Sequence, residues 1–418
     1  MRNNYLIKNA KQILTMQGKQ TGDIGILDNA SLYMEDGIIV CIGSNQQVQE
    51  YLGCQSPDEY ITFDATGKTV LPGFVDCHTH VVFGGSRVLE YVASITGNRN
   101  KINQLGLKTG IYATIDMTNA MTVDELMQQS AIRVQRMIET GSTTIESKSG
   151  YTLNTEGELQ MLRVNKKLER LLPVDMPSTF LGAHGWPRDK NKRDYMNQLI
   201  EEMMPQVQEQ GLAEFCDVWC DDGYYTAEES EEILIAGLDY GMRPRIHTDA
   251  YSYIGGSDLA AQMGMSSADH LNYTPVSTLK KLSQKNVVGV ILPAIEFAVA
   301  HPVPAKVRPM LEEGMTIALA TNCCPGAWVD SMQFVLILAC RQYGMTPEEA
   351  LYGATAAGAK ALLMEDRGIL APGKKADLQI WDVDTYEDAF YKYTLNPVSH
   401  IFKNGELVVE HGKLLEEV

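Results

Sequence analysis

The sequence of 418 residues is poor in positive charge, in clustered cysteines and in long apolar runs. It carries 35 Lys and Arg against 53 Asp and Glu, which gives a formal net charge of -18. Because nucleic acids and anionic membrane surfaces are bound through Lys and Arg, this balance argues against both as partners. No stretch approaches the roughly 18 consecutive apolar residues of a membrane-spanning helix.

The cysteine content and the first residues both bear on where the protein is found. Eight cysteines are scattered along the chain without the close spacing of a disulfide framework. The opening residues, MRNNYLIKNAKQ, lack the apolar segment of a secretion signal. We therefore expect reduced thiols and a cytoplasmic location. The remaining composition, 44% hydrophobic and 21% charged, is that of an ordinary globular protein with a large core.

Both ends of the chain have the pattern of short strands joined by tight turns. Residues 31–42 are rich in β-type apolar side chains and contain an Asp-Gly turn, and residues 400–411 contain an Asn-Gly turn between two short apolar runs. Such turns are typical of β-hairpins. We predict one small β-sandwich domain formed from residues 1–66 and 365–418.

The middle of the chain, residues 67–364, alternates between apolar strand candidates and amphipathic helical segments. This alternation is typical of a parallel sheet whose strands are connected by helices. Eight strand–helix repeats over about 250 residues predict a (β/α)8 barrel of the TIM type. The expected strands are residues 69–75, 142–145, 178–181, 215–219, 243–246, 267–268, 287–292 and 316–320.

Histidines gather at the ends of the expected strands, where the catalytic residues of such barrels lie. Five of the eight histidines in the sequence occupy these positions. Any one of them alone would more often be a hydrogen-bonded structural residue, but five together indicate a shared site. They are His78, His80, His184, His247 and His270.

His78 and His80 form a His-x-His motif after the first barrel strand. Side chains two residues apart on a strand point to the same face, so both imidazoles can reach one ion. With a distant third histidine they make a three-nitrogen set suited to zinc or iron. Such a site leaves a position for water, and the metal lowers the pKa of that water so that hydroxide is available near neutral pH.

The order of the motifs resembles that of the amidohydrolase superfamily, and within it the imidazolonepropionase family. VLPGFVDCHTH is similar to the opening metal motif of the superfamily. GGSR, ESKSGY, GAHGW, RIHTDAYS, SADHL and ALATNCCPG then follow in order. The His-x-His motif marks only the superfamily, whereas GGSR, SGY and GAH indicate the narrower family. The resemblance covers nearly the whole chain and implies a homodimeric enzyme that hydrolyses a cyclic amide in histidine degradation.

For the metal, the resemblance implies a mononuclear site. Its ligands would be His78, His80 and His247, with Asn322 at the fourth position. Imidazole nitrogens suit several transition metals, so zinc is the expected ion and iron is the alternative.

For the substrate, the resemblance implies a small molecule with a carboxylate. Arg87 and Tyr151 would hold that carboxylate, which suits the planar fork of an arginine. His184 and His270 would lie over the ring that is opened and take part in catalysis with Asn322. Arg87 could equally be a solvated surface charge, and Tyr151 a packed aromatic residue.

Two residues depart from the family pattern. Asn322 stands where the family has an aspartate, and Ala250 stands where it has a glutamate, three residues after His247. An amide oxygen can contact a metal or a water molecule, but it has no useful basicity. Both carboxylates of the family's proton transfer are therefore missing.

Four residues are candidates for the missing base. His270 is the first, because a neutral imidazole can accept a proton. Asp249, Glu146 and Asp269 are weaker candidates, and Asp249 is matched in the family motif, which makes a structural role at least as plausible.

Three functions remain open on the sequence alone. The leading one is a metal-dependent hydrolase that opens a cyclic amide, with imidazolonepropionate as substrate. The second is a related amidohydrolase that acts on another cyclic amide or deaminates a heterocycle. The third is a catalytically impaired ligand-binding protein on the same scaffold, because a fold alone does not establish an activity.

Overall fold

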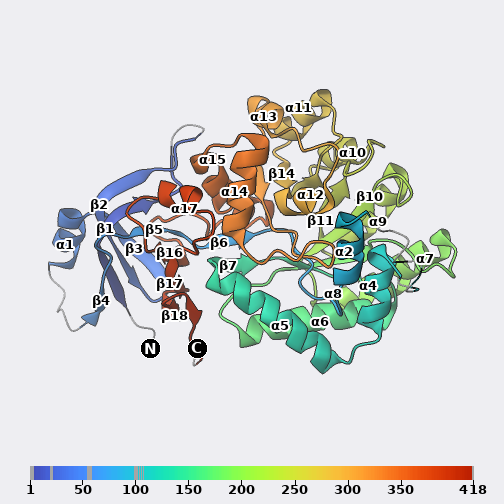
Figure 1. Cartoon of the computed structure of the whole chain (residues 1–418), viewed down its shortest axis with the longest axis horizontal. Coiled ribbons are helices and arrows are strands. Elements are labelled where there is room, and N and C mark those ends of the chain that lie inside the picture. The colour runs from blue at the N-terminus through green and yellow to red at the C-terminus, as the bar shows by residue number, and fades with distance from the viewer. Residues whose placement is uncertain are drawn as a thin grey trace.

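The computed structural model describes residues 4–18, 22–53, 59–97, 102, 104, 106 and 108–416. It has two parts, a small sheet made from both ends of the chain and a larger barrel of strands and helices (Figure 1). Within these described ranges, no helix combines the length and the apolar character needed to cross a bilayer.

The small part is a sheet of nine strands drawn from both chain ends. The strands are β1 (Tyr5–Leu14), β2 (Ile26–Glu35), β3 (Ile38–Ser44), β4 (Ile61–Asp64), β5 (Thr69–Pro72), β16 (Leu378–Trp381), β17 (Val398–Lys403), β18 (Glu406–Glu410) and β19 (Lys413–Leu414). Their order is β19-β18-β17-β16-β5-β1-β2-β3, and β4 pairs with β1. Both predicted hairpin turns form, because Asp36, Gly37, Asn404 and Gly405 all adopt positive φ.

This sheet folds back over its own apolar core. The N–H of Ile39 in β3 donates to the carbonyl of Lys374 at 2.9 Å. Strand β3, at one end of the strand order, therefore lies beside the segment that precedes β16. Ile13, Leu32 and Phe402, which come from opposite ends of the sequence, are fully buried in the same cluster. The predicted small β domain from both chain ends is therefore confirmed.

The larger part is a barrel of parallel strands. They are β6 (Phe74–Asp76), β7 (Ser142–Ile145), β8 (Ser147–Lys148), β9 (Ser178–Ala183), β10 (Phe215–Cys220), β11 (Arg243–Pro244), β12 (Ile246–Thr248), β13 (Ser267–His270), β14 (Val288–Ile291) and β15 (Ile317–Leu319). The order is β15-β14-β13-β12-β10-β9-β8, and β6 pairs with β7. Beyond β15, the N–H of Asn322 donates to the carbonyl of His78 at 3.1 Å and joins the last strand position to the first. The predicted (β/α)8 barrel is thus confirmed.

The first predicted strand, residues 69–75, is in fact two strands that belong to different parts. β5 pairs with β1 and β16 in the small sheet, whereas β6 pairs with β7 in the barrel. Gly73 separates them at a close approach, where a Cβ would lie 2.2 Å from Oγ1 of Thr143. The small sheet therefore extends beyond residue 66, and we propose Gly73 as the boundary. The second boundary, at residue 365, stays a prediction.

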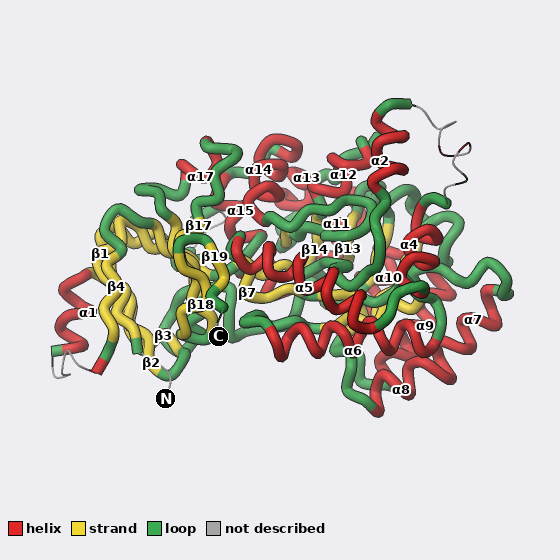
Figure 2. Tube along the Cα trace, turned by 60° about the horizontal axis from the view of Figure 1, so that its bottom comes forward, coloured by secondary structure: helices red, strands yellow, loops and turns green. Residues whose placement is uncertain are grey.

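Helices surround the barrel strands, as both views show (Figures 1 and 2). Those that follow the early strands are α2 (Val88–Ile95), α4 (Gly110–Asn119), α5 (Val123–Glu139), α6 (Thr155–Leu171), α7 (Lys192–Gln198), the π-helical turn η2 (Leu199–Met203), α8 (Met204–Glu209) and α9 (Ala227–Asp239). Helices α5, α6 and α9 and the run from α7 to α8 lie between barrel strands, where the alternating pattern predicts helices. The side chain of Thr122 accepts the N–H of Glu125, and the Glu125 side chain accepts the N–H of Thr122, so a capping box starts α5.

The remaining helices complete the later repeats and the small part. They are α1 (Asn45–Leu52), α10 (Gly256–Met263), α11 (Val276–Gln284), α12 (Pro293–Val299), α13 (Val307–Glu312), α14 (Met332–Tyr343), α15 (Pro347–Gly353), α16 (Ala356–Ala361) and α17 (Glu387–Tyr391).

Candidate metal centre and substrate site

Four buried side chains meet where β6, β12 and β15 end. His78 and His80 follow β6, His247 lies in β12, and Asn322 follows β15. The ring centroids of His78 and His247 are 4.5 Å apart, and that of His80 lies 5.5 Å from each. None of the four residues is more than 5% exposed. The structure therefore brings the residues of the expected ligand set together at the C-terminal end of the barrel.

Each of these four residues has a buried polar atom without a hydrogen-bond partner among the described residues. The atoms are Nε2 of His78, Nδ1 of His80, Nε2 of His247 and Oδ1 of Asn322. Buried polar atoms are rarely left unpaired in proteins, because each one costs free energy. Three imidazole nitrogens and one amide oxygen form a donor set that a divalent transition metal accepts. The residues present therefore fit a metal ion.

Two buried aspartates orient two of the imidazoles. Nδ1 of His78 lies 2.6 Å from Oδ2 of Asp269, and Nδ1 of His247 lies 3.0 Å from Oδ2 of Asp217. A carboxylate at Nδ1 keeps the proton there and leaves the lone pair of Nε2 free for a metal. Asp269, which the sequence offered as a weak base candidate, is thus a partner of His78.

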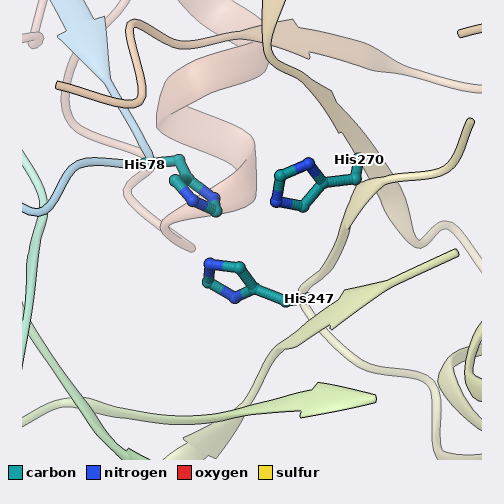
Figure 3. A group of neighbouring side chains, drawn as sticks. All are labelled: His78, His247 and His270. Atoms are coloured by element: carbon teal, nitrogen blue, oxygen red, sulfur yellow. The ribbon is translucent and has the colours of Figure 1, made fainter. Parts of the chain in front are cut away.

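His184, His270 and Tyr151 surround the buried imidazoles. The ring of His184 stacks on His80 at 5.1 Å and 12°, and Tyr151 lies 5.1 Å from His184. The ring of His270 lies 5.4 Å from that of His247, and Figure 3 shows both turned toward the same space as His78. Burial lowers the pKa of His184 to about 3 and that of His270 well below its ordinary value, so both imidazoles are neutral near pH 7.

The backbone at two of these positions is left-handed. His270 has φ of 80° and Asn322 has φ of 48°. Asparagine and histidine occur in this region more often than most side chains, but the conformation is uncommon and costs free energy for any residue other than glycine. Conformations of this kind cluster at functional sites, where the surrounding structure enforces them. The turn after β13 therefore holds His270 over the imidazole cluster at some cost in stability.

The guanidinium of Arg87, the predicted carboxylate-binding group, is paired with Glu90 in the first turn of α2. Nε donates to Oε2 at 2.8 Å, and Nη2 donates to Oε1 at 2.6 Å. Partial burial acts to raise the pKa of the Glu90 carboxyl, but the hydrogen bonds and charge of Arg87 outweigh it and leave the pKa below its ordinary value. The fork of Arg87 is thus partly engaged within the protein, which the sequence did not indicate.

The comparison with known sequences gives the family. The model of the amidohydrolase family matches residues 227–408. The imidazolonepropionase of Shouchella clausii (strain KSM-K16) is 38% identical over 425 residues, which cover 98% of this chain and 94% of the relative. That of Geobacillus sp. (strain WCH70) is 37% identical, with 98% of both chains covered. The chain belongs to the imidazolonepropionase family.

Solved structures of more distant proteins share the fold. An adenosine deaminase from Xanthomonas campestris with bound zinc has a TM-score of 0.73 at 13% identity, over 100% of this chain and 95% of its own. A mutant of the atrazine chlorohydrolase TrzN from Arthrobacter aurescens, complexed with zinc and atraton, has a TM-score of 0.71 at 15% identity, over 99% of this chain and 97% of its own. At these identities the likeness shows the fold alone.

Two overlapping groups of histidines are close enough to share an ion. The ligand nitrogens of His78, His247 and His270 all lie within 4.8 Å of one another, and so do those of His80, His184 and His247. The ligand set expected for an imidazolonepropionase takes its three histidines from both groups. Its unpartnered nitrogens are buried, whereas His270 is half-buried and Nδ1 of His184 lies 3.2 Å from a backbone carbonyl. Neither group contains both His78 and His80, so the family set stays a prediction.

A cluster of buried charges lies beneath the imidazoles. Nζ of Lys148 is 2.8 Å from Oε1 of Glu146 and 3.0 Å from Oδ2 of Asp217, and Nη2 of Arg245 is 3.1 Å from Oδ2 of Asp269. All five side chains are fully buried, so the carboxylates are balanced by cations rather than by water. Burial acts to raise the pKa of Asp217, but its imidazole partner and Lys148 hold it well below the ordinary value.

The other candidates for a base have structural partners. Glu146 accepts hydrogen bonds from Lys148 and from the N–H of Thr79 at 3.0 Å. Asp249 accepts hydrogen bonds from Ser257 at 2.5 Å and from Thr274 at 2.6 Å. Each carboxylate is therefore occupied in holding the barrel ends together.

Ala250 is 3% exposed and brings only a methyl group to the position after Asp249.

Proposed function

We propose that the protein is a metal-dependent hydrolase that opens a cyclic amide by breaking a C–N bond, with imidazolonepropionate as its substrate in histidine degradation. Family membership supports the class of reaction. The observation that carries the proposal is that His78, His80, His247 and Asn322, at neighbouring strand ends of the barrel, each have a buried donor atom without a hydrogen-bond partner among the described residues.

These four residues would hold one divalent metal ion, with zinc expected and iron as the alternative. When bound, such an ion supplies a Lewis acid and a water molecule whose pKa is lowered toward neutrality. Asp217 and Asp269 accept hydrogen bonds from Nδ1 of His247 and His78, so that each imidazole would present Nε2 to the ion.

Proton transfer falls to His270 in this chain. Asn322 and Ala250 offer no basic group, whereas the neutral imidazole of His270 faces the cluster. We assign His270 the proton of the attacking water and its delivery to the ring nitrogen that leaves. His184 packs against the substrate ring, and Arg87 with Tyr151 binds its carboxylate.

Metal analysis of the purified protein, followed by an assay of ring opening on imidazolonepropionate, tests the proposal. We expect one metal ion per chain and formation of the ring-opened product. If the protein contains metal but does not form this product, the result favours the related amidohydrolase. Other cyclic amides, and heterocycles that can be deaminated, are then assayed as substrates. Absence of both metal and turnover favours the ligand-binding alternative and contradicts the proposal. His247→Ala, which removes a central ligand, is the matched negative control.

We also propose that the protein is a cytoplasmic homodimer that acts on a small molecule and on neither nucleic acid nor membrane. The excess of acidic residues supports the exclusion of both polyanionic partners. Light scattering on the purified protein tests the dimer, and a monomeric mass at micromolar concentration would contradict it.

A further inference from the structure

Among the residues that the structure describes, the guanidinium of Arg87 hydrogen-bonds only to Glu90, which leaves part of it free. A guanidinium has five N–H donors arranged along two edges that can each grip a carboxylate. Glu90 takes the side edge, through Nε at 2.8 Å and Nη2 at 2.6 Å. The end edge, formed by one N–H group of Nη1 and the second N–H group of Nη2, remains available.

Glu90 is itself held in place from two sides. Its Oε2 accepts a hydrogen bond from the N–H of Gly110 at 3.1 Å, and Gly110 is the first residue of α4. The N–H of Tyr91 donates to the carbonyl of Arg87 at 3.0 Å. This backbone hydrogen bond closes the first turn of α2, which carries Glu90. The two side chains are 19% and 23% exposed, so the pair is shielded from most of the solvent.

The free edge of Arg87 lies against the loop that begins with Asn322. A Cβ at Gly326 would lie 3.6 Å from Nη1 of Arg87 and 3.7 Å from Sγ of Cys324. The absence of a side chain at Gly326 therefore leaves room beside Nη1. The charge of Arg87 also acts on the phenol of Tyr151, the other residue assigned to the substrate carboxylate.

We propose that Glu90 is a positioning residue for substrate binding. It fixes the plane of the Arg87 guanidinium through the side edge and thereby presents the end edge to the carboxylate of the substrate. This inference rests on the proposed function, because it assumes a substrate with a carboxylate. It adds that the carboxylate is held by Nη1 and Nη2 of Arg87, and that Glu90 remains in place when substrate binds.

Glu90→Gln tests the inference, because glutamine keeps an acceptor for Gly110 but loses the charged two-point grip on Arg87. We expect KM for imidazolonepropionate to rise about tenfold, the scale of one charge-assisted hydrogen bond, while kcat stays within about twofold. Glu50→Gln, which changes an exposed acid on α1, should change neither constant.

A binding measurement gives a readout without turnover. By calorimetry on the metal-loaded protein, 3-(imidazol-4-yl)propionate should bind about tenfold more weakly to Glu90→Gln than to the wild type. The neutral probe 4-methylimidazole should bind both proteins equally, because it has no carboxylate for Arg87.

Three results would overturn the inference while leaving the proposed function intact. Tighter binding of the propionate by Glu90→Gln would mean that Glu90 competes with substrate and is displaced. Equal weakening of both probes would mean that Glu90 has only a structural role, and unchanged binding of both would mean that it has none. If the wild type neither binds the propionate nor opens imidazolonepropionate, the proposed function itself falls and this inference falls with it.

Discussion

Asp217 holds His247 by two atoms at once. Its Oδ1 accepts the backbone N–H of His247 at 3.0 Å, and its Oδ2 lies 3.0 Å from Nδ1 of the ring. The two residues lie on neighbouring parallel strands, β10 and β12, where Trp219 is in register with His247. One carboxylate therefore fixes both the main chain and the ring of a candidate metal ligand. The same carboxylate forms an ion pair with Nζ of Lys148 at 3.0 Å.

The first prediction concerns this contact. Asp217→Asn should weaken metal binding by about 10–100-fold, because the amide no longer accepts the Nδ1 proton with a full charge and the imidazole loses its fixed tautomer. Competition between the protein and a chelator of known affinity measures the change. Asp222→Asn, at an exposed position in the loop after β10, is the matched control. Unchanged metal affinity in Asp217→Asn would contradict the role of Asp217 in orienting His247 as a ligand.

The second prediction concerns Asn322. Asn322→Asp supplies a carboxylate beside the imidazoles, and combined with Ala250→Glu it should raise kcat for imidazolonepropionate by about 10²-fold or more, the usual scale of general acid–base catalysis. Steady-state kinetics on the two single variants and the double variant measure the gain. A double variant no faster than the wild type would point to a different chemistry in this chain.

The sequence placed His78, His80, His247 and Asn322 at the barrel mouth because each ends or follows an apolar run, and the resemblance to the family then selected them as the expected ligands. It did not predict Asp217 or Arg245, since both lie within or between strand segments and meet their partners only through pairing with neighbouring strands. Glu90 was missed although it lies only three residues after Arg87, a spacing at which side chains of a helical turn can pair. The split at Gly73 did have a signal, the Pro72-Gly73 pair, but the apolar run hid it.

The third prediction concerns Lys148, the buried cation between Glu146 and Asp217. Lys148→Met leaves these carboxylates without their nearest positive charge, and the free energy of unfolding should fall by about 3–5 kcal/mol. Urea denaturation measures the loss. Lys167→Met, at an exposed position of α6, should change stability by less than about 0.5 kcal/mol. If Lys148→Met lowered the free energy of unfolding by no more than Lys167→Met does, the charge cluster would not stabilise the fold.

The fourth prediction concerns the junction between the barrel and the small sheet, where Asp175 meets Lys403 at 2.7 Å together with Arg367. Burial acts to raise the pKa of Asp175, but these cations outweigh it and lower the pKa below its ordinary value. Since the folded pKa is the lower one, the carboxylate stabilises the fold above the unfolded pKa of about 4 and loses this effect as the pH falls toward the folded value.

Asp175→Asn should therefore lower the free energy of unfolding at pH 7 by about 2 kcal/mol, and the difference from wild type should shrink below pH 4. Denaturant titrations of both proteins from pH 7 to pH 3 measure this, and a difference that grows with acidity would refute the assigned direction of the pKa shift.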